Sequence, residues 1–183
     1  MIKKKICIVD YGFGNITSLE NALKYLNHDY VTLKKPNNLN SFTHLFLPGV
    51  GSFEAGIAKL KELKWDENIK QFVSNGGYVF GICLGMQLLF KYGTNEKTDQ
   101  IINGLGLIEG KCEKFSKKIE KEKFPLPHVG FNAVNYKKSK IWNGVKNNSY
   151  FYFIHSYRIS HKYNQNLSST TLYGEKFISF VES

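Results

Sequence analysis

The 183-residue sequence has few cysteines and no long apolar segment. Its three cysteines, Cys7, Cys83 and Cys112, are widely separated and odd in number, which excludes a closed disulfide framework and paired zinc-ligand spacing. No apolar run reaches the roughly 18 residues that a membrane-spanning helix needs. The lysine-rich start also lacks the apolar region and cleavage site of a signal peptide. We therefore expect a soluble, cytoplasmic protein without a membrane partner.

Acidic residues are also scarce relative to basic ones, with 15 Asp and Glu against 25 Lys and Arg, a formal charge of +10. A basic excess favours nucleic-acid binding when it is gathered on one face. Here the lysines are scattered, and the densest stretch, residues 111–123, interleaves them with glutamates, which is typical of a solvated surface. We expect no nucleic-acid partner. The 42% hydrophobic content indicates one globular domain over residues 1–183.

Strand-like and helix-like periodicities alternate through the first hundred residues. Strands are predicted at residues 6–9, 30–33, 45–47 and 78–80. Helices are predicted after the loop at residues 11–15 and over residues 53–63 and 66–75. This order implies right-handed crossovers and a mostly parallel sheet covered by helices. Later strand-like segments follow one another directly, at residues 105–108, 150–154, 170–173 and 178–181. The sequence thus predicts an α/β fold with a β-rich second half.

The strongest local signal for chemistry is Gly81-Ile82-Cys83-Leu84-Gly85, between a predicted strand and a predicted helix. This is the layout of a nucleophile elbow with cysteine as the nucleophile. The turn lifts the sulfur clear of the sheet and places it near free helical N–H groups, which favour a thiolate. The N–H of Leu84 could then form half of an oxyanion hole. The alternative is that Cys83 is a small buried hydrophobe beside incidental glycines. We favour the nucleophile because the strand-turn-helix context agrees with it.

A second glycine-bearing loop, Pro48-Gly49-Val50-Gly51-Ser52-Phe53, follows the third predicted strand. In a parallel sheet it lies at the same carboxyl edge as the elbow. Its glycines could turn a backbone N–H toward a reacting carbonyl. An ordinary strand-to-helix turn with Ser52 as the N-cap explains the sequence equally well.

The first loop carries Gly12 and Gly14, but Thr17 occupies the place of the third glycine of a dinucleotide-binding fingerprint. We expect neither a cofactor nor a metal ion. A thiolate needs a histidine partner, and the candidates are His28, His44, His128, His155 and His161. His155 stands out because it ends an aromatic strand, although a structural role is equally compatible with that position.

Five ordered motifs resemble the glutaminase subunits of imidazole glycerol phosphate synthase, which are class I glutamine amidotransferases. The motifs begin at Asp10, Pro48, Gly81, Pro127 and Phe153, and together they span nearly the whole chain. The resemblance implies a flavodoxin-like amidotransferase fold. It also implies glutamine as substrate, a γ-glutamyl thioester on Cys83, and a heterodimer with a (β/α)8-barrel synthase that uses the ammonia in histidine biosynthesis.

The resemblance also assigns roles to individual residues. Gly51 and Leu84 would supply oxyanion-hole N–H groups, and His155 matches a family histidine that is not the catalytic one. The glutamine pocket would be lined by Gly49, Gln87, Glu96, Ser156 and Tyr157. The partner interface would include His128, Phe131 and Asn132.

Two departures from the family pattern leave alternatives open. The family usually has tryptophan at Phe131, and a related group of amidotransferases supplies ammonia for the amidation of surface-glycan sugars. The family's catalytic His and Glu belong to a Phe-His-Pro-Glu motif that would follow Ser183, so a C-terminal segment is expected to be missing from this sequence. A truncated, non-catalytic binding domain, or a different cysteine hydrolase with His155 as base, are the remaining alternatives.

Overall fold

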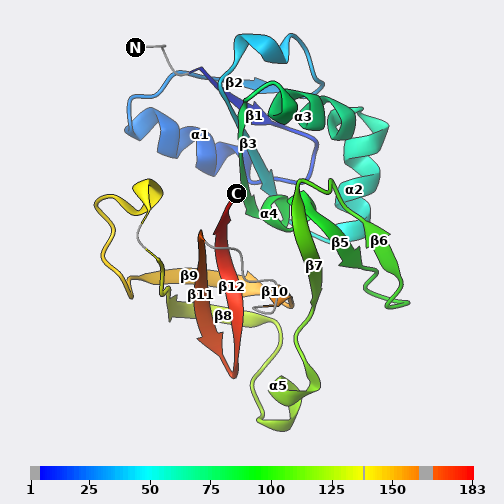
Figure 1. Ribbon diagram of the computed structural model, residues 1–183, viewed down its shortest axis with the longest axis vertical. Coiled ribbons are helices and arrows are strands. Elements are labelled where there is room, and N and C mark those ends of the chain that lie inside the picture. Colours follow the sequence, from blue (N-terminus) through cyan, green and yellow to red (C-terminus); the bar gives the residue numbers. More distant parts are fainter. Residues whose placement is uncertain (1–4, 138, 161–166) are drawn as a thin grey trace. The chain divides into compact units, whose positions relative to one another are not determined.

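The computed structural model describes residues 5–137, 139–160 and 167–183 (Figure 1). The chain forms two compact units, residues 1–107 and residues 108–183. His161, one of the candidate bases, lies outside the described residues. Within the described ranges, no helix is long and apolar enough to cross a membrane.

The first unit contains a four-stranded parallel sheet with the strand order β2-β1-β3-β4. Its strands are β1 (Ile6–Val9), β2 (Tyr30–Leu33), β3 (His44–Gly49) and β4 (Tyr78–Cys83). All three pairings are parallel, as the alternation of strands and helices predicted. All four residues of β1 are buried, which is the pattern of a strand whose sheet is covered on both faces.

The helices of this unit are α1 (Ile16–Tyr25), α2 (Phe53–Glu62), α3 (Trp65–Ser74) and the short α4 (Leu84–Leu89). A side-chain cap begins each of the first two: Asn15 accepts from the Ser18 N–H at 3.3 Å, and Ser52 accepts from the Ala55 N–H at 3.3 Å. Helix α1 buries Leu23 against β1. These caps and contacts place the loops after β1 and β3 at the carboxyl edge of the sheet.

The sequence did not predict the hairpin of β5 (Phe90–Thr94) and β6 (Ile101–Asn103), nor the 3₁₀ turn η1 (Leu39–Ser41). The strand predicted at residues 105–108 is wrong for its first three residues. The N–H groups of Leu105 and Leu107 instead donate to the carbonyls of Leu88 and Leu89 at 2.9 Å, and Gly106 has a φ of +70°. The next strand begins only at Ile108.

The second unit is built mainly from antiparallel strands, which confirms the predicted β-rich second half. Strands β11 (Leu167–Tyr173), β12 (Glu175–Glu182), β10 (Tyr157–Ser160) and β7 (Ile108–Lys114) are adjacent in this order. A two-stranded ribbon pairs β8 (His128–Ala133) with β9 (Tyr150–His155). The short helices are α5 (Lys117–Lys121) and η2 (Lys140–Trp142).

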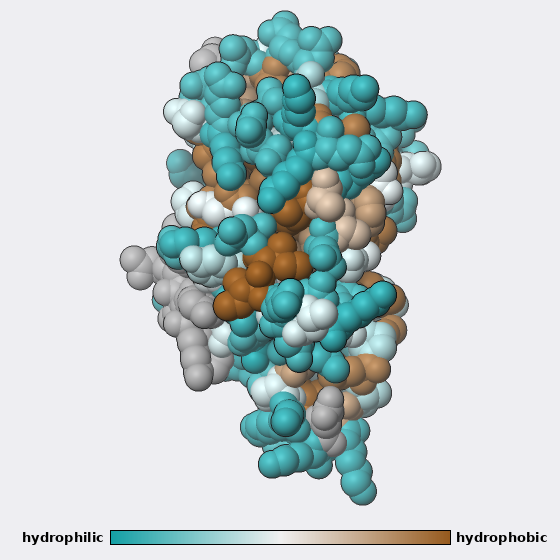
Figure 2. Space-filling view, turned by 90° about the vertical axis from the view of Figure 1, so that its right-hand side faces the viewer, coloured by the Kyte–Doolittle hydropathy of each residue, from teal (hydrophilic) through white to brown (hydrophobic). Residues whose placement is uncertain are grey.

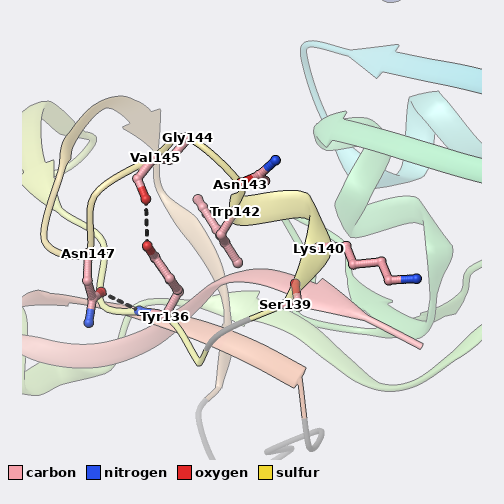
Figure 3. A pocket seen from close by; sticks show the side chains of 8 residues that line it. All are labelled: Tyr136, Ser139, Lys140, Trp142, Asn143, Gly144, Val145 and Asn147. Carbon is pink, nitrogen blue, oxygen red and sulfur yellow. Dashed lines mark hydrogen bonds between the residues drawn. The ribbon is translucent and has the colours of Figure 1, made fainter.

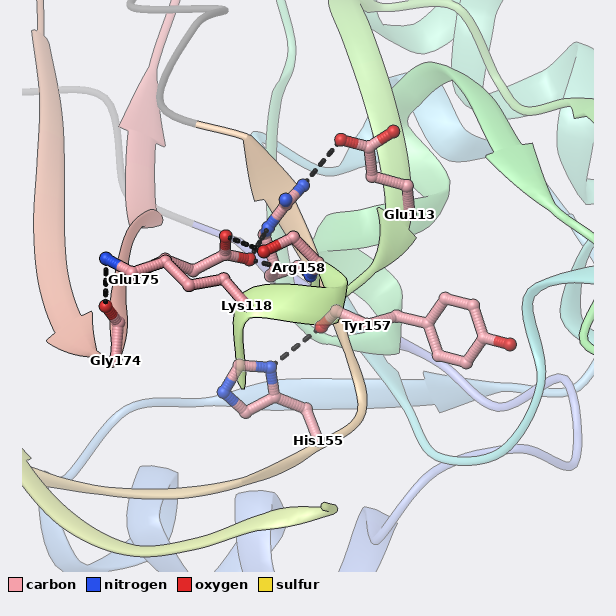
Figure 4. A network of polar contacts seen from close by, with 8 residues as sticks. Glu113, Lys118, His155, Tyr157, Arg158, Gly174 and Glu175 are labelled. Atoms are coloured by element: carbon pink, nitrogen blue, oxygen red, sulfur yellow. Dashed lines mark hydrogen bonds and ion pairs between the residues drawn. The ribbon is translucent and has the colours of Figure 1, made fainter. Parts of the chain in front are cut away.

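A buried arginine connects three strands of the second unit (Figure 4). Arg158 on β10 is 8% exposed and donates to Glu113 on β7 at 2.6 Å and to Glu175 on β12 at 3.0 Å. Ser116 donates its N–H and its hydroxyl to the two oxygens of Glu175, at 3.0 and 2.6 Å. Burial alone would raise the pKa of Glu175, but the bonds from Ser116 and the charge of Arg158 outweigh it, so the pKa is lowered.

Replacing Arg158 should therefore destabilise the second unit. We expect Arg158→Met to lower the free energy of unfolding by about 3 kcal/mol at pH 7, because two carboxylates lose their buried counter-ion. The folded pKa of Glu175 lies below the unfolded value, so its contribution is present above the unfolded pKa and is lost as pH falls through the folded pKa. The difference between variant and wild type should consequently shrink in acid.

Urea unfolding followed by near-ultraviolet circular dichroism at pH 7 and pH 3 measures both effects. Lys118→Met is the matched control, since the exposed Lys118–Glu122 pair, with its atoms 3.5 Å apart, should contribute less than about 0.5 kcal/mol. A variant at Arg158 as stable as wild type at pH 7 would contradict the expectation.

Candidate active site

The strand-to-helix turn at Cys83 has the geometry of a nucleophile elbow. Cys83 is the last residue of β4, and α4 begins at the next residue. Its φ of +55° and ψ of −117° lie in a region that residues with a side chain rarely adopt. The surrounding structure therefore holds Cys83 in a strained conformation, which is a recurrent property of catalytic positions.

Two glycines make this sharp turn possible. A Cβ at Gly81 would lie 2.6 Å from both the nitrogen and the Cα of Met86. A Cβ at Gly85 would overlap the carbonyl oxygen of Leu47 on β3. Glycine is thus required at both flanking positions, because any side chain there would clash with backbone atoms. This agrees with the sequence motif.

Gly49 is the residue that lies opposite Cys83 in the parallel pairing of β3 with β4. A Cβ at Gly49 would lie 2.6 Å from the Tyr11 hydroxyl, 2.7 Å from the Gly85 nitrogen and 2.9 Å from the Leu84 Cβ. The elbow, the end of β3 and the first loop therefore converge at one point of the carboxyl edge.

Tyr11 is a residue of this site to which the sequence assigned no role. It is 1% exposed and stacks on Phe13 with 5.8 Å between ring centroids, and its hydroxyl has no hydrogen-bond partner among the residues that the structure describes. Burial raises the pKa of Tyr11, and the charge of a Cys83 thiolate raises it further. The signal that could have revealed Tyr11 is its position, directly after a buried strand at the edge where ligands bind.

The loop after β3 follows the residue that pairs with Cys83, and one of its backbone amides is already hydrogen-bonded. The Val50 N–H donates to the carbonyl of Phe13 at 2.6 Å. Gly51 has a φ of +103°, and Ser52 caps α2 as one of the two readings predicted. Because a helix cap and an oxyanion-hole amide involve different groups, both readings of this loop remain compatible. The role of Gly51 stays a prediction.

The Cys83 sulfur is accessible, whereas Cys7 and Cys112 are buried. Desolvation by its neighbours raises the pKa of the Cys83 thiol above its ordinary value, and the hydrogen bond from the Leu84 N–H opposes that rise. Burial raises the pKa of Cys7 to about 12. Helix α4 has only six residues. The expected thiolate is therefore stabilised more by the hydrogen bond from the nearest N–H than by a helix dipole.

The other predicted pocket residues are distributed over both units. Gln87 is half-buried in the first turns of α4, and Glu96 is exposed in the turn between β5 and β6. Ser156 and Tyr157 are half-buried in the second unit, where Tyr157 begins β10. Their contact with glutamine stays a prediction.

Neither histidine of the first unit is placed to activate Cys83. His44 pairs with Tyr78 at the start of β3, five residues before the position opposite Cys83, or about 16 Å along the strand. Its Nδ1 contacts the Thr43 hydroxyl at 2.8 Å. His28 is exposed beyond the end of α1.

Both ring nitrogens of His155 are occupied within the second unit. Its Nδ1 lies 2.7 Å from the Tyr157 carbonyl oxygen, and its Nε2 lies 2.9 Å from Nδ1 of His128. Burial lowers the pKa of His155 to about 4, with the Tyr157 bond opposing and the charge of His128 adding to the effect. These contacts disfavour His155 as the base of another cysteine hydrolase.

The β8–β9 ribbon presents an exposed apolar face that contains one of the predicted interface residues. Phe131 is 67% exposed, pairs with Tyr152 across the ribbon and has its ring 5.4 Å from that of Tyr152. Val129 and Ile154 form the adjacent exposed pair. His128 requires a correction, because its side chain is fully buried and can support this face but not line it. Asn132 is half-buried and bonds to His128.

A separate pocket lies in the loop between β8 and β9 (Figure 3). Tyr136 stacks on Trp142 with 4.6 Å between ring centroids, and its hydroxyl donates to the Val145 carbonyl at 2.6 Å. None of the residues predicted for catalysis lines this pocket. Its aromatic and amide groups bond to one another, so the elbow is the better candidate site.

Comparison with known proteins agrees with the geometry of the elbow. Residues 6–134 match the family model of the CobB/CobQ-like glutamine amidotransferase domain. The chain therefore belongs to the class I glutamine amidotransferases. It is 38% identical over 178 residues to the imidazole glycerol phosphate synthase subunit HisH 2 of Methanococcus maripaludis, covering 96% of this chain and 85% of that protein. It is 37% identical over 175 residues to the HisH subunit of Helicobacter hepaticus, covering 87% and 77%.

Solved structures support the fold. A crystal structure of a glutamine amidotransferase matches with a TM-score of 0.63 at 17% identity, covering 84% of this chain and 72% of that one. A chain of PurLQS from Thermotoga maritima matches with a TM-score of 0.56 at 19% identity, covering 86% and 69%. The expected α/β amidotransferase fold is thereby confirmed.

The three thiols should differ sharply in reactivity. We expect a diazo-ketone glutamine analogue to label Cys83, because only this sulfur is accessible. With iodoacetamide, the labelling rate should rise about tenfold per pH unit until the raised pKa of Cys83 is reached, since the thiolate is the nucleophile. Peptide mass spectrometry with Cys83→Ala as control measures this. Labelling mainly on Cys7 or Cys112 would be the contrary result.

The close approach at Gly85 should be intolerant of one added methyl group. We expect Gly85→Ala to lower the free energy of unfolding by at least about 3 kcal/mol and to abolish selective labelling of Cys83, because the Leu47 carbonyl is backbone and cannot rotate away.

Gly56→Ala on α2 is the matched control for this substitution. Its new methyl would lie 3.1 and 3.4 Å from the two Leu88 methyl groups and 3.3 Å from a Leu84 methyl group, which are side-chain atoms and can shift where the backbone cannot. We expect a change within about 1 kcal/mol, since alanine also favours the helix. Equal effects of the two substitutions on urea unfolding would remove the special status of Gly85.

Proposed function

We propose that this chain is the glutaminase subunit of an imidazole glycerol phosphate synthase and supplies ammonia to a (β/α)8-barrel partner in histidine biosynthesis. The observation that carries the proposal is the strained, accessible Cys83 between two obligatory glycines. The relatives that match nearly the whole chain are named as subunits of imidazole glycerol phosphate synthase, which supports this function over the amidation of glycan sugars. The free thiols suit a reducing, cytoplasmic compartment.

The elbow is suited to acyl transfer from glutamine. The Cys83 thiolate would attack the side-chain amide carbon, and the carbonyl oxygen would gain negative charge. The Leu84 N–H, already directed at the sulfur, would stabilise this charge together with an amide of the loop at Gly49 to Gly51. The C–N bond then breaks, a proton is delivered to the leaving nitrogen as ammonia departs, and water releases glutamate from the thioester.

This sequence of steps requires a general base, because the pKa of the Cys83 thiol is raised. His44 is remote from Cys83 along β3, and His155 has both nitrogens bonded in the second unit. We assign the base to the His-Pro-Glu motif that the family carries in the segment following the residue equivalent to Ser183.

The exposed apolar face of the ribbon is the surface that we assign to the partner. Phe131, Tyr152 and Ile154 are each more than half exposed and adjacent on one face. On the face that Figure 2 shows, the surface is largely hydrophilic and hydrophobic side chains are gathered in limited patches. Aromatic residues gathered in this way are characteristic of interface hot spots.

Glutaminase activity should depend on the partner and on this face. In a chain extended through the His-Pro-Glu motif, we expect slow glutamate release alone and faster release with a barrel synthase, because the Val50 N–H must first leave the Phe13 carbonyl. The paired substitution Phe131→Ala with Tyr152→Ala should weaken partner binding at least tenfold, or about 1.4 kcal/mol. The 183-residue chain should release glutamate several powers of ten more slowly, by analogy with other catalytic triads.

The measurements are steady-state glutamate release and partner affinity by calorimetry. Tyr25→Ala, which removes an 86% exposed aromatic from α1, is the matched control and should change neither. Full activity of the isolated extended subunit would contradict gating by the partner. Comparable rates for the 183-residue and extended chains would contradict the assignment of the base.

A further inference from the structure

A continuous chain of hydrogen-bonding groups runs through the core of the second unit. The Asn132 amide nitrogen lies 3.1 Å from the Leu172 carbonyl oxygen, and its amide oxygen lies 2.8 Å from His128 Nε2. His128 Nδ1 lies 2.9 Å from His155 Nε2, and His155 Nδ1 lies 2.7 Å from the Tyr157 carbonyl oxygen. Both ends of this chain are backbone carbonyls, which can only accept.

The number of hydrogens available is one fewer than the number of contacts. Four contacts need four hydrogens. The side chain of Asn132 supplies one along the chain, because its oxygen faces one neighbour and its nitrogen the other, and each neutral imidazole supplies one. Rotating the amide or exchanging a tautomer moves the deficit to another contact but does not remove it. With neutral histidines, two lone pairs must face each other at one of the four contacts.

We propose that His128 and His155 together form a buried proton-binding site, which holds one extra proton between His128 Nδ1 and His155 Nε2. The bound proton comes from solvent, and it converts the opposed lone pairs into an N–H···N hydrogen bond. The pair then carries a single positive charge, with the outer nitrogens donating to Asn132 and to the Tyr157 carbonyl.

The surroundings of the pair suit one charge and exclude a second. His128 stacks between Tyr173 and Phe153, with ring centroids at 3.9 and 5.3 Å, and His155 contacts Phe177 at 5.0 Å. Ring faces attract a cation. Burial lowers the pKa of His128 and of His155, and the charge of His128 lowers the pKa of His155 further. A second proton would enter an already charged, buried pair, whereas the first completes a bond that is otherwise missing.

Several titratable groups on the neighbouring elements are engaged elsewhere. Tyr173 donates its hydroxyl to the Pro125 carbonyl at 2.7 Å. Glu113 and Glu175 accept from Arg158, and Lys118 contacts the Gly174 carbonyl and Glu122. The network in Figure 4 shows His155 directed at the backbone of Tyr157, whose ring points away from it. The pair therefore depends on its own contacts for its proton.

The protonated chain would link four strands, because Asn132 and His128 lie on β8, His155 on β9, Tyr157 on β10 and Leu172 on β11. His128 and His155 are also direct partners in the pairing of β8 with β9. The site thus lies on the buried side of the ribbon whose other side exposes Phe131 and Tyr152.

Histidine ring nitrogen spectra of the whole chain test the proposal. With ¹⁵N-labelled histidine, we expect His128 and His155 to titrate together in one step that takes up one proton. The protonated form should show three ring N–H groups and a coupling between the two nitrogens that share the proton. Two independent titrations, or an inter-ring coupling that persists with only two ring N–H groups and unchanged Asn132 contacts, would overturn it.

Substitutions of Asn132 give opposite predictions. Asn132→Leu removes the acceptor beyond His128, so the neutral pair can form all its remaining bonds and its shared pKa should fall by about one unit. Asn132→Asp puts a carboxylate against His128 and should raise it by about one unit. Asn135→Leu, at an exposed amide bonded to Asn148, is the control and should leave it unchanged. Should Asn132→Leu fail to fold, the wild-type and Asn132→Asp titrations decide: equal values in these two would also overturn the proposal.

Discussion

The contact on which the candidate site depends is the approach of α4 to the backbone of β3, with Gly85 directly against the Leu47 carbonyl. This approach forces the chain to reverse within two residues of Gly81 and holds Cys83 at a positive φ. It also brings Leu84 beside Gly49. Accessibility of the sulfur, its hydrogen bond from the Leu84 N–H and the position of the loop after β3 all follow from one backbone contact. The strain at Cys83 is maintained because the end of β3 against which it packs, from Leu47 to Gly49, is buried and cannot yield.

The first unit could be predicted well because its signals are local. Strand β1 and helices α2 and α3 begin and end within about two residues of where apolar periodicity placed them, α1 begins directly after the predicted loop, and glycine spacing located the elbow. The prediction failed where hydrogen bonds, not periodicity, decide the conformation. The pattern of residues 105–107 predicts a strand, yet their N–H groups donate to carbonyls of α4 and β5. No property of Leu105 or Leu107 in the sequence indicates these bonds. The place of Tyr11 in the site was not predicted for a related reason, because only the pairing of the strands brings it close to Gly49.

The second unit shows the limit of sequence reasoning more plainly. Arg158 bonds to residues 45 and 17 positions away, and His128 bonds to a residue 27 positions away. No spacing rule connects such positions, so a motif could identify His128 and His155 but not their contact. Resemblance therefore placed His128 on the partner surface, whereas burial places it beneath that surface. What distinguishes the His128–His155 pair is a shortage of hydrogens. Its chain of four contacts ends in a carbonyl acceptor on each side, and neutral side chains supply one hydrogen too few. This shortage becomes apparent only from the three-dimensional arrangement.

Two opposing electrostatic requirements meet at Cys83. A nucleophilic sulfur must be surrounded closely enough to hold glutamine and exclude water, and that same desolvation raises the pKa of its thiol. The hydrogen bond from the Leu84 N–H offsets the rise only in part. A cysteine in this environment therefore stays protonated until a base is positioned beside it. Without its base such a site would hydrolyse little glutamine, because the thiol is still protonated and the Val50 N–H is still bonded to the Phe13 carbonyl. The coupling of glutamine hydrolysis to the acceptor that we propose would then rest on the desolvation that raises the pKa of the Cys83 thiol.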